Sequence, residues 1–400
     1  MVQQKLVSSE KTNEKEKICR EELKPQLRFS EFTDNWKESN LGNLFNFSVA
    51  GDMDKELFSE IKDEEFKYPL YANALEKEGL LGYYKESKYI ANSITITARG
   101  NIGHSIVRKS DFNAIGRLII LNSKKELNND FFSEYINSNL KFYIESTGVP
   151  QLTAPSLKIN KVKYPNLDEQ NKISNFILAI NKKIELLEKK KEKSNQTKSS
   201  ILKSIFDNVT IYSEDVKINN LFSIKKGKGL SKEKIDVNGK YAAILYGELY
   251  TKYSEIIESP ISFTDYDEGV PSKKGDILIP GSTTTKGIDL VTASVVCEDN
   301  IQLGGDINIL RKKKELNPIY AATFIKYFMK REILRLTQGS TIIHLYGKDL
   351  KDLEIMLPSL KIQNNVANFI KHYNTKENLY NEEINKVKRF KKALLQKMFV

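Results

Sequence analysis

Apolar side chains recur at steps of three and four along two long charged segments of the chain, 165–206 and 358–399. This spacing places them on one face of a helix. The first stripe comprises Ile173, Phe176, Ile177, Ile180, Ile184 and Leu187, and the second comprises Val366, Phe369, Ile370, Tyr373, Tyr380, Ile384 and Val387. At about 1.5 Å per residue such a helix extends roughly 60 Å, which is longer than a compact domain is wide. We therefore expect the two stripes to pack on each other.

The two segments are also copies of each other. They align over 42 residues without a gap, at a constant offset of 193, with 14 identities. In the first copy the stripe turns polar at Lys191, Ser194 and Lys198 before apolar residues resume. Because each copy closes one half of the chain, a pseudo-two-fold arrangement pairs the helices antiparallel.

Shorter repeats show that the duplication extends beyond the helices. The stretch LGNLFNFS recurs as INNLFSIK, and LNNDFFSEYINS, which is typical of an amphipathic helix, recurs as LNPIYAATFIKY. Runs rich in Ile, Val, Thr and Tyr predict strands within 89–100, 116–122, 240–247, 275–282 and 306–311. The sequence therefore predicts an α+β protein: two duplicated α/β domains separated by two long helices that form an antiparallel coiled coil with pseudo-two-fold symmetry.

A chain of 400 residues is too long for one ordinary core, which agrees with two globular halves. The predicted divisions are a flexible charged tail (1–24), a first domain (25–164), a central long helix (165–206), a second domain (207–357) and a C-terminal long helix (358–400).

The net charge of +11 resides mainly in the helices. The first domain has 18 basic and 18 acidic side chains and the second has 21 of each, whereas the helices carry nine against five and nine against three. A basic surplus indicates a polyanionic or acidic partner for the helices, and a solvated lysine-rich surface is the alternative.

Signals for membranes, metals and catalysis are absent from the sequence. No apolar run approaches 18 residues and no N-terminal apolar region is present, so we expect a cytoplasmic protein without a membrane partner. The three histidines are scattered and no catalytic constellation is found, so we expect no catalytic or metal-binding residue. The stretch NPIY (317–320) resembles a methyltransferase loop without its second proline, and N-capping of a helix explains it.

Several loops carry side chains suited to DNA. Arg and Asn make bidentate contacts to guanine and adenine edges, whereas Lys and small hydroxyls suit phosphates. The candidates are Arg99, Asn101 and His104 on a glycine-bounded turn, Lys225, Lys226 and Lys228, Thr283, Thr284 and Lys286, and His344 and Tyr346. A solvated turn is the alternative interpretation for each.

The doubled order of these features resembles the specificity (S) subunit of Type I restriction–modification enzymes over residues 25–400. The resemblance is carried by RFSEFTDNW, by ITITARGNIG and by the entry P-x-L-x-x-Q-x-x-[IV]-x-x-F-I to each long helix, at Pro165 and at Pro358. One departure is that Glu169 precedes the glutamine in the first copy, as is usual in the family, whereas Ile362 replaces it in the second. We expect this difference to alter a local cap or a partner contact.

The resemblance implies two target recognition domains, each reading one half of a bipartite site in double-stranded DNA. The paired helices then set the gap between the halves and scaffold two methyltransferase (M) subunits and, in the full enzyme, restriction (R) subunits. S-adenosylmethionine, ATP and Mg belong to those partners, and this chain binds no cofactor and is no enzyme by itself. The alternatives are a DNA methyltransferase or nuclease in its own right, or a coiled-coil adaptor that binds only proteins.

Overall fold

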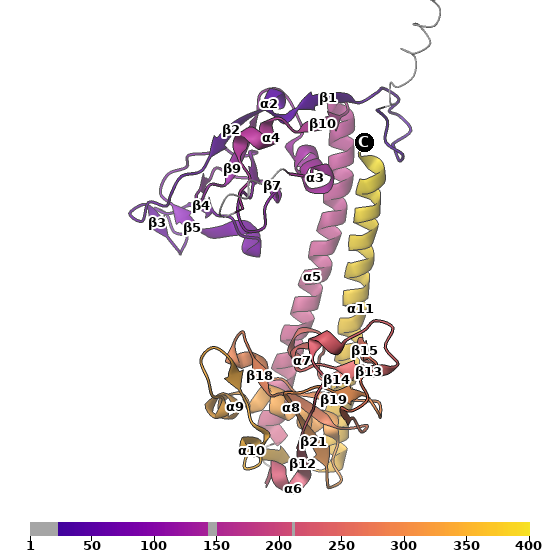
Figure 1. Ribbon diagram of the computed structural model, residues 1–400. Helices are drawn as coiled ribbons and strands as arrows, with labels where there is room; N and C mark the ends of the chain where they lie inside the picture. Colours follow the sequence, from indigo (N-terminus) through magenta and orange to yellow (C-terminus); the bar gives the residue numbers. More distant parts are fainter. Residues whose placement is uncertain (1–22, 143–149, 210–212) are drawn as a thin grey trace, which may run out of the picture. The chain divides into compact units, whose positions relative to one another are not determined.

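The computed structural model describes residues 23–142, 150–209 and 213–400, which form two compact units (Figure 1). Unit 1 comprises Met1–Glu185 and Asn385–Val400, and unit 2 comprises Leu186–Ile384. Almost all of the tail predicted over 1–24 lies outside the described residues. Each unit contains one end of each long helix, α5 (Leu167–Val209) and α11 (Leu360–Met398).

Unit 1 is built on two four-stranded sheets and a two-stranded one. The first sheet has the order β2 (Phe45–Val49), β9 (Ile119–Ser123), β6 (Ile94–Ile96), β7 (Ser105–Val107). The second has the order β3 (Phe58–Ser59), β5 (Leu80–Tyr84), β4 (Tyr68–Tyr71), β8 (Asn113–Ala114). The small sheet pairs β1 (Lys37–Asn40) with β10 (Lys161–Tyr164).

Unit 2 repeats this plan with one strand more in its first sheet. That sheet has the order β12 (Phe222–Lys226), β21 (Ile307–Lys312), β17 (Ile277–Pro280), β19 (Ser294–Val296), β14 (Ile256–Ile257). The second has the order β15 (Ser262–Thr264), β13 (Tyr241–Ile244), β20 (Gln302–Leu303), β16 (Val270–Pro271). Two small sheets pair β11 (Glu214–Lys217) with β23 (Glu354–Leu357), and β18 (Ser282–Thr283) with β22 (Ile343–His344).

The helices of the two units correspond as well. The pairs are α2 (Leu41–Leu44) with α6 (Ile218–Leu221), α3 (Asn129–Asn139) with α8 (Pro318–Phe328), and α4 (Ala154–Lys158) with α10 (Gly347–Leu350). Unit 2 also has α7 (Tyr246–Thr251) and α9 (Lys330–Leu336). Short 3₁₀ turns lie at Glu76–Gly79 in unit 1 and at Lys232–Lys234 and Gly287–Leu290 in unit 2. Asn317 caps α8 by accepting hydrogen bonds from the backbone N–H groups of Ile319 and Tyr320, which confirms the capping interpretation of NPIY.

The central strands are continuously apolar because each is covered by a core on both faces. In β9, Ile119 and Leu121 belong to the core shared with the long helices, whereas Ile120 belongs to the smaller core on the opposite face of the sheet. Successive side chains of a strand point to opposite faces, so a strand covered on both sides needs no polar alternation. In β21, Leu310 and Ile309 divide between two cores in the same way.

The long helices run antiparallel, as predicted. In unit 1 the early residues Ile173 and Ile177 of α5 share a core with the late residue Leu395 of α11. In unit 2 the late residue Phe206 of α5 shares a core with the early residue Ile370 of α11. The same contacts therefore recur in both units with the roles of the two helices exchanged, which confirms the predicted fold class.

Each long helix ends on an aromatic cluster of the unit it enters. Phe399 lies edge-on to Phe131, with ring centroids 5.4 Å apart, and it also contacts Tyr135 at 5.3 Å. Phe206, its copy, contacts Tyr320 at 5.4 Å and Phe324 at 5.6 Å. Phe399 also packs against Trp36, so the last residues of the chain complete the core of the first domain.

A glutamine at the start of each long helix joins the helix to its unit. Gln170 donates to the carbonyl of Pro165 at 2.9 Å and accepts from the N–H of Asn128 at 3.0 Å. Gln363 makes the same pair of bonds at 2.8 and 2.9 Å, with Pro358 and Asn317. Both glutamines are buried, so these bonds satisfy backbone groups that water does not reach. The P-x-L-x-x-Q motif is therefore a structural one.

Glu169 makes contacts that its counterpart in the second helix, Ile362, does not make. Its carboxylate is fully buried and accepts two hydrogen bonds from Arg28, at 2.8 and 2.7 Å, and a longer one from the indole N–H of Trp36. Both donors belong to RFSEFTDNW, which has no copy before unit 2. Ile362 thus stands where no such segment has to be held.

Candidate nucleic-acid interface

A surface hollow occupies the same place in the fold of each unit. The register of strand pairing defines the equivalence: Val49 pairs with Ile119 in unit 1 as Lys226 pairs with Asn308 in unit 2. The hollow of unit 1 measures about 410 Å³, and its lining includes Val49, Arg99, Arg117, Ile119 and Gln151. That of unit 2 measures about 250 Å³ and is lined by Ile224, Lys225, Lys226, Gly281, Asp306, Asn308, His344, Leu345, Tyr346, Gly347 and Lys348.

Arg99 is held along the wall of the unit 1 hollow. Its Nε and Nη2 both donate to Oε1 of Gln151, at 2.9 and 2.7 Å, while the side chain stays exposed. The neighbouring Leu152 donates its N–H to the carbonyl of Ala98, which joins the two loops that carry Arg99 and Gln151. The candidate arginine is thus preorganised by a residue 52 positions away.

Asn101 and His104 lie elsewhere. Both line a larger groove of unit 1 between the β7 and α3 side and the long helices, away from the hollow that contains Arg99. Their turn is closed by Thr97, which donates to the carbonyl of Asn101 and accepts from the N–H of His104. Gly103 has φ of 88°, and a Cβ there would meet the ring of Phe142 at 2.2 Å, so the turn requires glycine. Burial and the charge of Arg108 lower the pKa of His104.

The unit 2 hollow gathers four of the candidates, Lys225, Lys226, His344 and Tyr346. The rings of His344 and Tyr346 stack with their centroids 5.8 Å apart. Lys226 pairs with Asp306 at 2.9 Å across the floor.

The remaining candidates of unit 2 stand outside this hollow. Thr283 is buried in β18 next to β22, where its hydroxyl bonds with that of Thr285, whereas Thr284, Lys286 and Lys228 are exposed on loops.

Asp306 stays ionised within the hollow. Burial opposes its ionisation, but hydrogen bonds from Lys226 and Ser282 and the charge of Lys226 outweigh this, so the pKa of Asp306 is lowered. Asp306 has φ of 56° and Arg117, at the equivalent position of unit 1, has φ of 70°. Non-glycine residues adopt the left-handed region uncommonly, and functional sites are among the places where they do.

Among the hollow residues that sequence reasoning missed are Arg117, Gln151, Asp306 and Lys348. A signal was available for two of them. The strand runs GRLIIL and GDINIL align from Gly116 on Gly305, which places Arg117 opposite Asp306. Gln151 and Lys348 lie in loops, 148–158 and 339–348, that occupy matching places in the two halves but share almost no side chains, so the sequence singles out neither residue.

The predicted stripe residues of the long helices differ in exposure. Ile173, Ile177, Leu187, Val366, Ile370 and Ile384 are buried, whereas Ile180, Ile184, Phe369, Tyr373, Tyr380 and Val387 are partly buried. Phe176 is 36% exposed, and its ring lies edge-on to Phe29 of the N-terminal segment.

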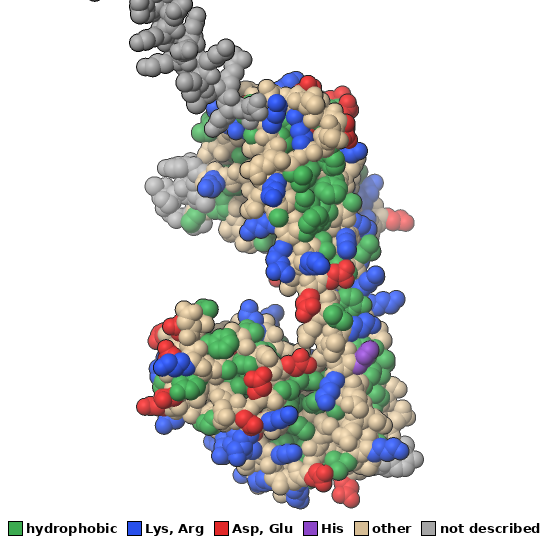
Figure 2. Space-filling model, turned by 90° about the vertical axis from the view of Figure 1, so that its right-hand side faces the viewer, with side chains coloured by type: hydrophobic (Ala, Val, Ile, Leu, Met, Phe, Trp, Pro, Cys, Tyr) green, Lys and Arg blue, Asp and Glu red, His purple; other side chains and the backbone are tan. Residues whose placement is uncertain are grey.

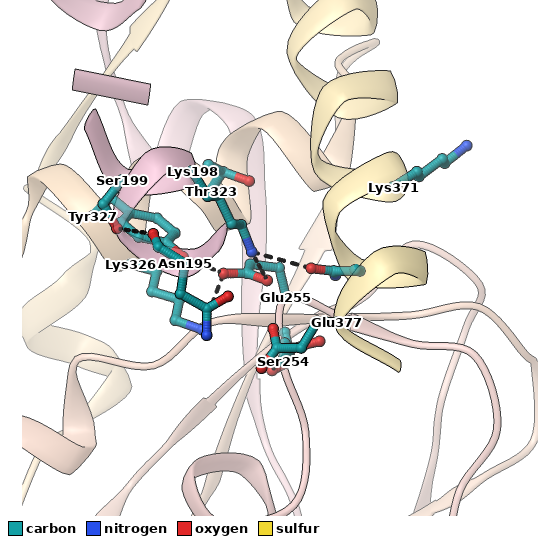
Figure 3. Close-up of polar contacts among 12 residues, drawn as sticks. Asn195, Lys198, Ser199, Ser254, Glu255, Thr323, Lys326, Tyr327, Lys371 and Glu377 are labelled. Carbon is teal, nitrogen blue, oxygen red and sulfur yellow. Dashed lines mark hydrogen bonds and ion pairs between the residues drawn. The ribbon is translucent and has the colours of Figure 1, made fainter. Parts of the chain in front are cut away.

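Polar residues on the stripe of α5 have partners in unit 2. Lys198, only 5% exposed, pairs with Glu255 at 2.8 Å and donates to Oδ1 of Asn374 on α11 at 3.1 Å. Tyr327 donates to the same carboxylate at 2.6 Å, and Lys326 lies 3.1 Å from it. In Figure 3 the side chain of Lys198 points to Glu255, whereas that of Lys371 points away.

This buried carboxylate stays charged in the folded protein. Burial opposes the ionisation of Glu255, but the charges of Lys326 and Lys198 and the hydrogen bonds from Lys198 and Tyr327 outweigh it, so its pKa lies well below the ordinary value. The cluster ties both long helices to the sheets of unit 2.

Unit 1 carries a more exposed counterpart of the cluster. Lys391 and Asn181, the copies of Lys198 and Asn374, both donate to Oε1 of Glu134 on α3, at 2.8 and 2.9 Å. The carboxylate thus comes from a different element in each unit, and in unit 1 the pair is about one-fifth exposed.

The surface shows no segregation of charge on the face seen in Figure 2. Lys and Arg side chains are spread over it and are interspersed with Asp and Glu. This distribution agrees with the balanced charge of the two predicted domains and leaves recognition to local side chains.

Taken together, the two units define a class of chain that carries two unlike surface hollows on one duplicated scaffold of strands and antiparallel helices. A family model described as the Type I restriction modification DNA specificity domain matches residues 33–196 and again 212–389. The chain therefore belongs to the family of Type I restriction–modification DNA specificity proteins, and it contains the family's domain twice.

Individual relatives are similar over different lengths. The chain is 32% identical over 117 residues to one type I specificity subunit of Mycoplasma pneumoniae and 31% identical over 144 residues to another. These matches span 32% and 43% of those relatives' own lengths. A Type I restriction enzyme specificity subunit of Methanocaldococcus jannaschii is 21% identical, and the match covers 90% of this chain and 91% of that one.

A solved structure shows the same fold. The crystal structure of a Type I restriction–modification system S subunit from M. genitalium aligns with a TM-score of 0.62 at 17% identity, over 94% of this chain and 99% of that one. No described helix combines the length and apolarity needed to cross a membrane.

Proposed function

We propose that this chain is the sequence-specific DNA-recognition subunit of a Type I restriction–modification enzyme, and that each unit reads one half of a bipartite site. The observation that carries the proposal is the occurrence of two copies of the specificity domain, each with a hollow of different chemistry. Two identical hollows would suit a symmetric site, whereas these two suit unlike half-sites.

The chain itself contributes recognition and no chemistry to this proposal. The reactions belong to two methyltransferase subunits that use S-adenosylmethionine and, in the complete enzyme, to restriction subunits that use ATP and Mg. The lysine-rich long helices are the proposed scaffold for these partners. A DNA methyltransferase in its own right is less well supported, because Asn317 of the NPIY stretch is engaged in capping α8.

Exchange of one domain tests the division of labour. Residues 25–164 are replaced by the first domain of another family member, and methylated positions are mapped across the genome of cells that carry the complete system. We expect one half of the recognised sequence to change while the other half and the gap stay the same. Alteration of both halves, or of neither, would contradict the proposal.

Shortening the helices tests their role in spacing. Lys191 of α5 donates to Asn381 of α11 at 2.8 Å, so the segments around these two residues, 186–192 and 380–386, are chosen for deletion together. Seven residues correspond to about 10 Å, or roughly three base pairs. We expect a gap shorter by about that number with both half-sites retained. A gap of unchanged length would refute a spacing role.

Salt dependence distinguishes this function from that of a protein-only adaptor. Affinity of the complex with its methyltransferase partners for DNA carrying the site should fall as salt rises, because phosphate contacts release counterions. Exchange of the chain for a deletion variant without residues 41–164 should abolish discrimination between DNA sequences in one half of the site and leave it in the other. An adaptor would leave discrimination unchanged.

A further inference from the structure

Equivalent positions in and beside the two hollows hold different side chains, both where these are exposed and where they are buried. Strand register and loop pairing match Val49 with Lys226, Arg99 with Ser282, Arg117 with Asp306, Ile119 with Asn308 and Gln151 with His344. One buried position beside them is unchanged: Leu152 and Leu345 are each 1% exposed and donate to Ala98 and Gly281, each at 2.9 Å. The scaffold of the hollow is thus duplicated while its lining is not.

Arg117 and Asp306 form the pair with the most opposed chemistry. Each follows a glycine and enters the central strand β9 or β21 in a left-handed conformation. Arg117 is exposed and donates no side-chain hydrogen bond to another described residue, so its guanidinium is available. Asp306 is held by Lys226 at 2.9 Å and by Ser282 at 3.1 Å, and its carboxylate retains acceptor capacity.

We infer that Arg117 and Asp306 are corresponding base-reading residues of the two units, Arg117 for a guanine and Asp306 for a cytosine. Arg donates bidentately to O6 and N7 of guanine, and a carboxylate accepts from N4 of cytosine. The inference rests on the proposed function and adds the residues that separate the two half-sites.

The neighbours of each residue fit this reading. In unit 1 the wall is formed by Arg99, fixed by Gln151, so the hollow presents donors. In unit 2 Lys226 neutralises part of the charge of Asp306, so the carboxylate can approach a base edge between phosphates at reduced electrostatic cost. Both residues lie just before central strands, β9 and β21, whose backbones are held on either side by ladder hydrogen bonds.

The test uses the complete complex with its methyltransferase partners and a set of DNA duplexes that carry every single-base change in the recognised site. For Arg117→Ala we expect the preference for guanine at one position of one half-site to weaken roughly 5- to 150-fold, with the other half unchanged. For Asp306→Asn we expect the same at a cytosine of the other half-site. Lys161→Ala is the matched control, because Lys161 is exposed in β10 and pairs with Glu38 outside the hollow.

Three results would overturn the inference. The first is that Arg117→Ala and Asp306→Asn both recognise the same DNA sequence as the unaltered complex. In that case continued methylation of a bipartite site would still support the proposed function. An equal loss of affinity for all sequences with a reduced salt slope would assign these residues to phosphates. If one substitution weakened the base preference in both half-sites, each residue would not belong to one half-site alone.

Two measurements separate folding and function from the inference. Emission of Trp36 and hydrogen exchange of the strands report whether each variant folds, and Arg117→Lys retains the charge without the bidentate geometry, so it should lose most of the guanine preference. Failure of the unaltered complex to recognise any bipartite site would refute the proposed function itself.

Discussion

Removal of the charge of Glu255 tests how much the buried ion pair between Glu255 and Lys198 of α5 stabilises unit 2. Glu255 is 1% exposed and lies against Lys198, which is 5% exposed. The isosteric change Glu255→Gln leaves this buried ammonium without a counter-charge, and breaking a buried pair in this way costs about 3–5 kcal/mol. We therefore expect unit 2 to lose about that much stability.

The equivalent change in unit 1 is the control. Glu134 and Lys391 are 17% and 21% exposed, and water solvates the lysine when Glu134→Gln removes its partner. We expect a loss of about 1 kcal/mol there, near the upper end of values for solvated pairs. The comparison holds the long-helix lysine and asparagine constant, while the burial differs and Glu255 has the further partners Tyr327 and Lys326.

The assay has to report each unit separately. The chain has one tryptophan, Trp36, which is buried in unit 1, so its emission during urea unfolding follows that unit. Hydrogen exchange of β14 and α8 follows unit 2. Glu255→Gln should raise exchange in unit 2 and leave the Trp36 transition almost unmoved. A loss no greater than that of Glu134→Gln would refute the argument from burial.

Three further predictions concern the helices. Phe399→Ala should destabilise unit 1 by about 3–5 kcal/mol and shift the emission of Trp36, because a buried ring is lost, whereas the exposed control Phe390→Ala should change neither. Gln363→Leu should cost about 1–3 kcal/mol in urea unfolding, because a buried backbone N–H loses its acceptor, and the control Asn364→Ala should cost less since Asn364 is exposed. The folded-state pKa of Glu255 lies below its ordinary value of 4.5, so its stabilisation is complete above pH 4.5 and is lost as the pH falls. The difference in unfolding free energy between the unaltered chain and Glu255→Gln should therefore be constant above about pH 5 and shrink steadily as the pH falls below 4.5, and a difference that stays constant below pH 4.5 would contradict this.

The identities between the two long helices turn out to mark shared contacts. Gln170 and Gln363 hold the same loops, and Phe206 and Phe399 enter the same aromatic clusters. Asn181, Asn374, Lys198 and Lys391 all belong to the carboxylate clusters. A comparison of the chain with itself could therefore predict the helices, their antiparallel pairing and much of what they hold.

The residues that line the hollows are harder to predict from a comparison of the chain with itself. Arg99 was identified from a local turn, but the same turn also suggested Asn101 and His104, which the structure places in a different groove. Gln151 comes to Arg99 from a loop 52 residues away, and it has no local pattern of its own. Residue type and spacing predict which side chains can bind DNA, and strand register decides which of them share a surface.

The sequence by itself determined the duplication, the two long helices and the mixed α/β halves, because these follow from periodicity and repeated order along the chain. Tertiary structure alone decided that Lys198 finds its carboxylate in Glu255 while its copy Lys391 finds Glu134, and that Arg117 and Asp306, which the sequence alignment already matches, line unlike hollows. The physical reason is that helical periodicity is local, whereas a buried charge or a surface hollow is completed by residues that only chain closure brings together.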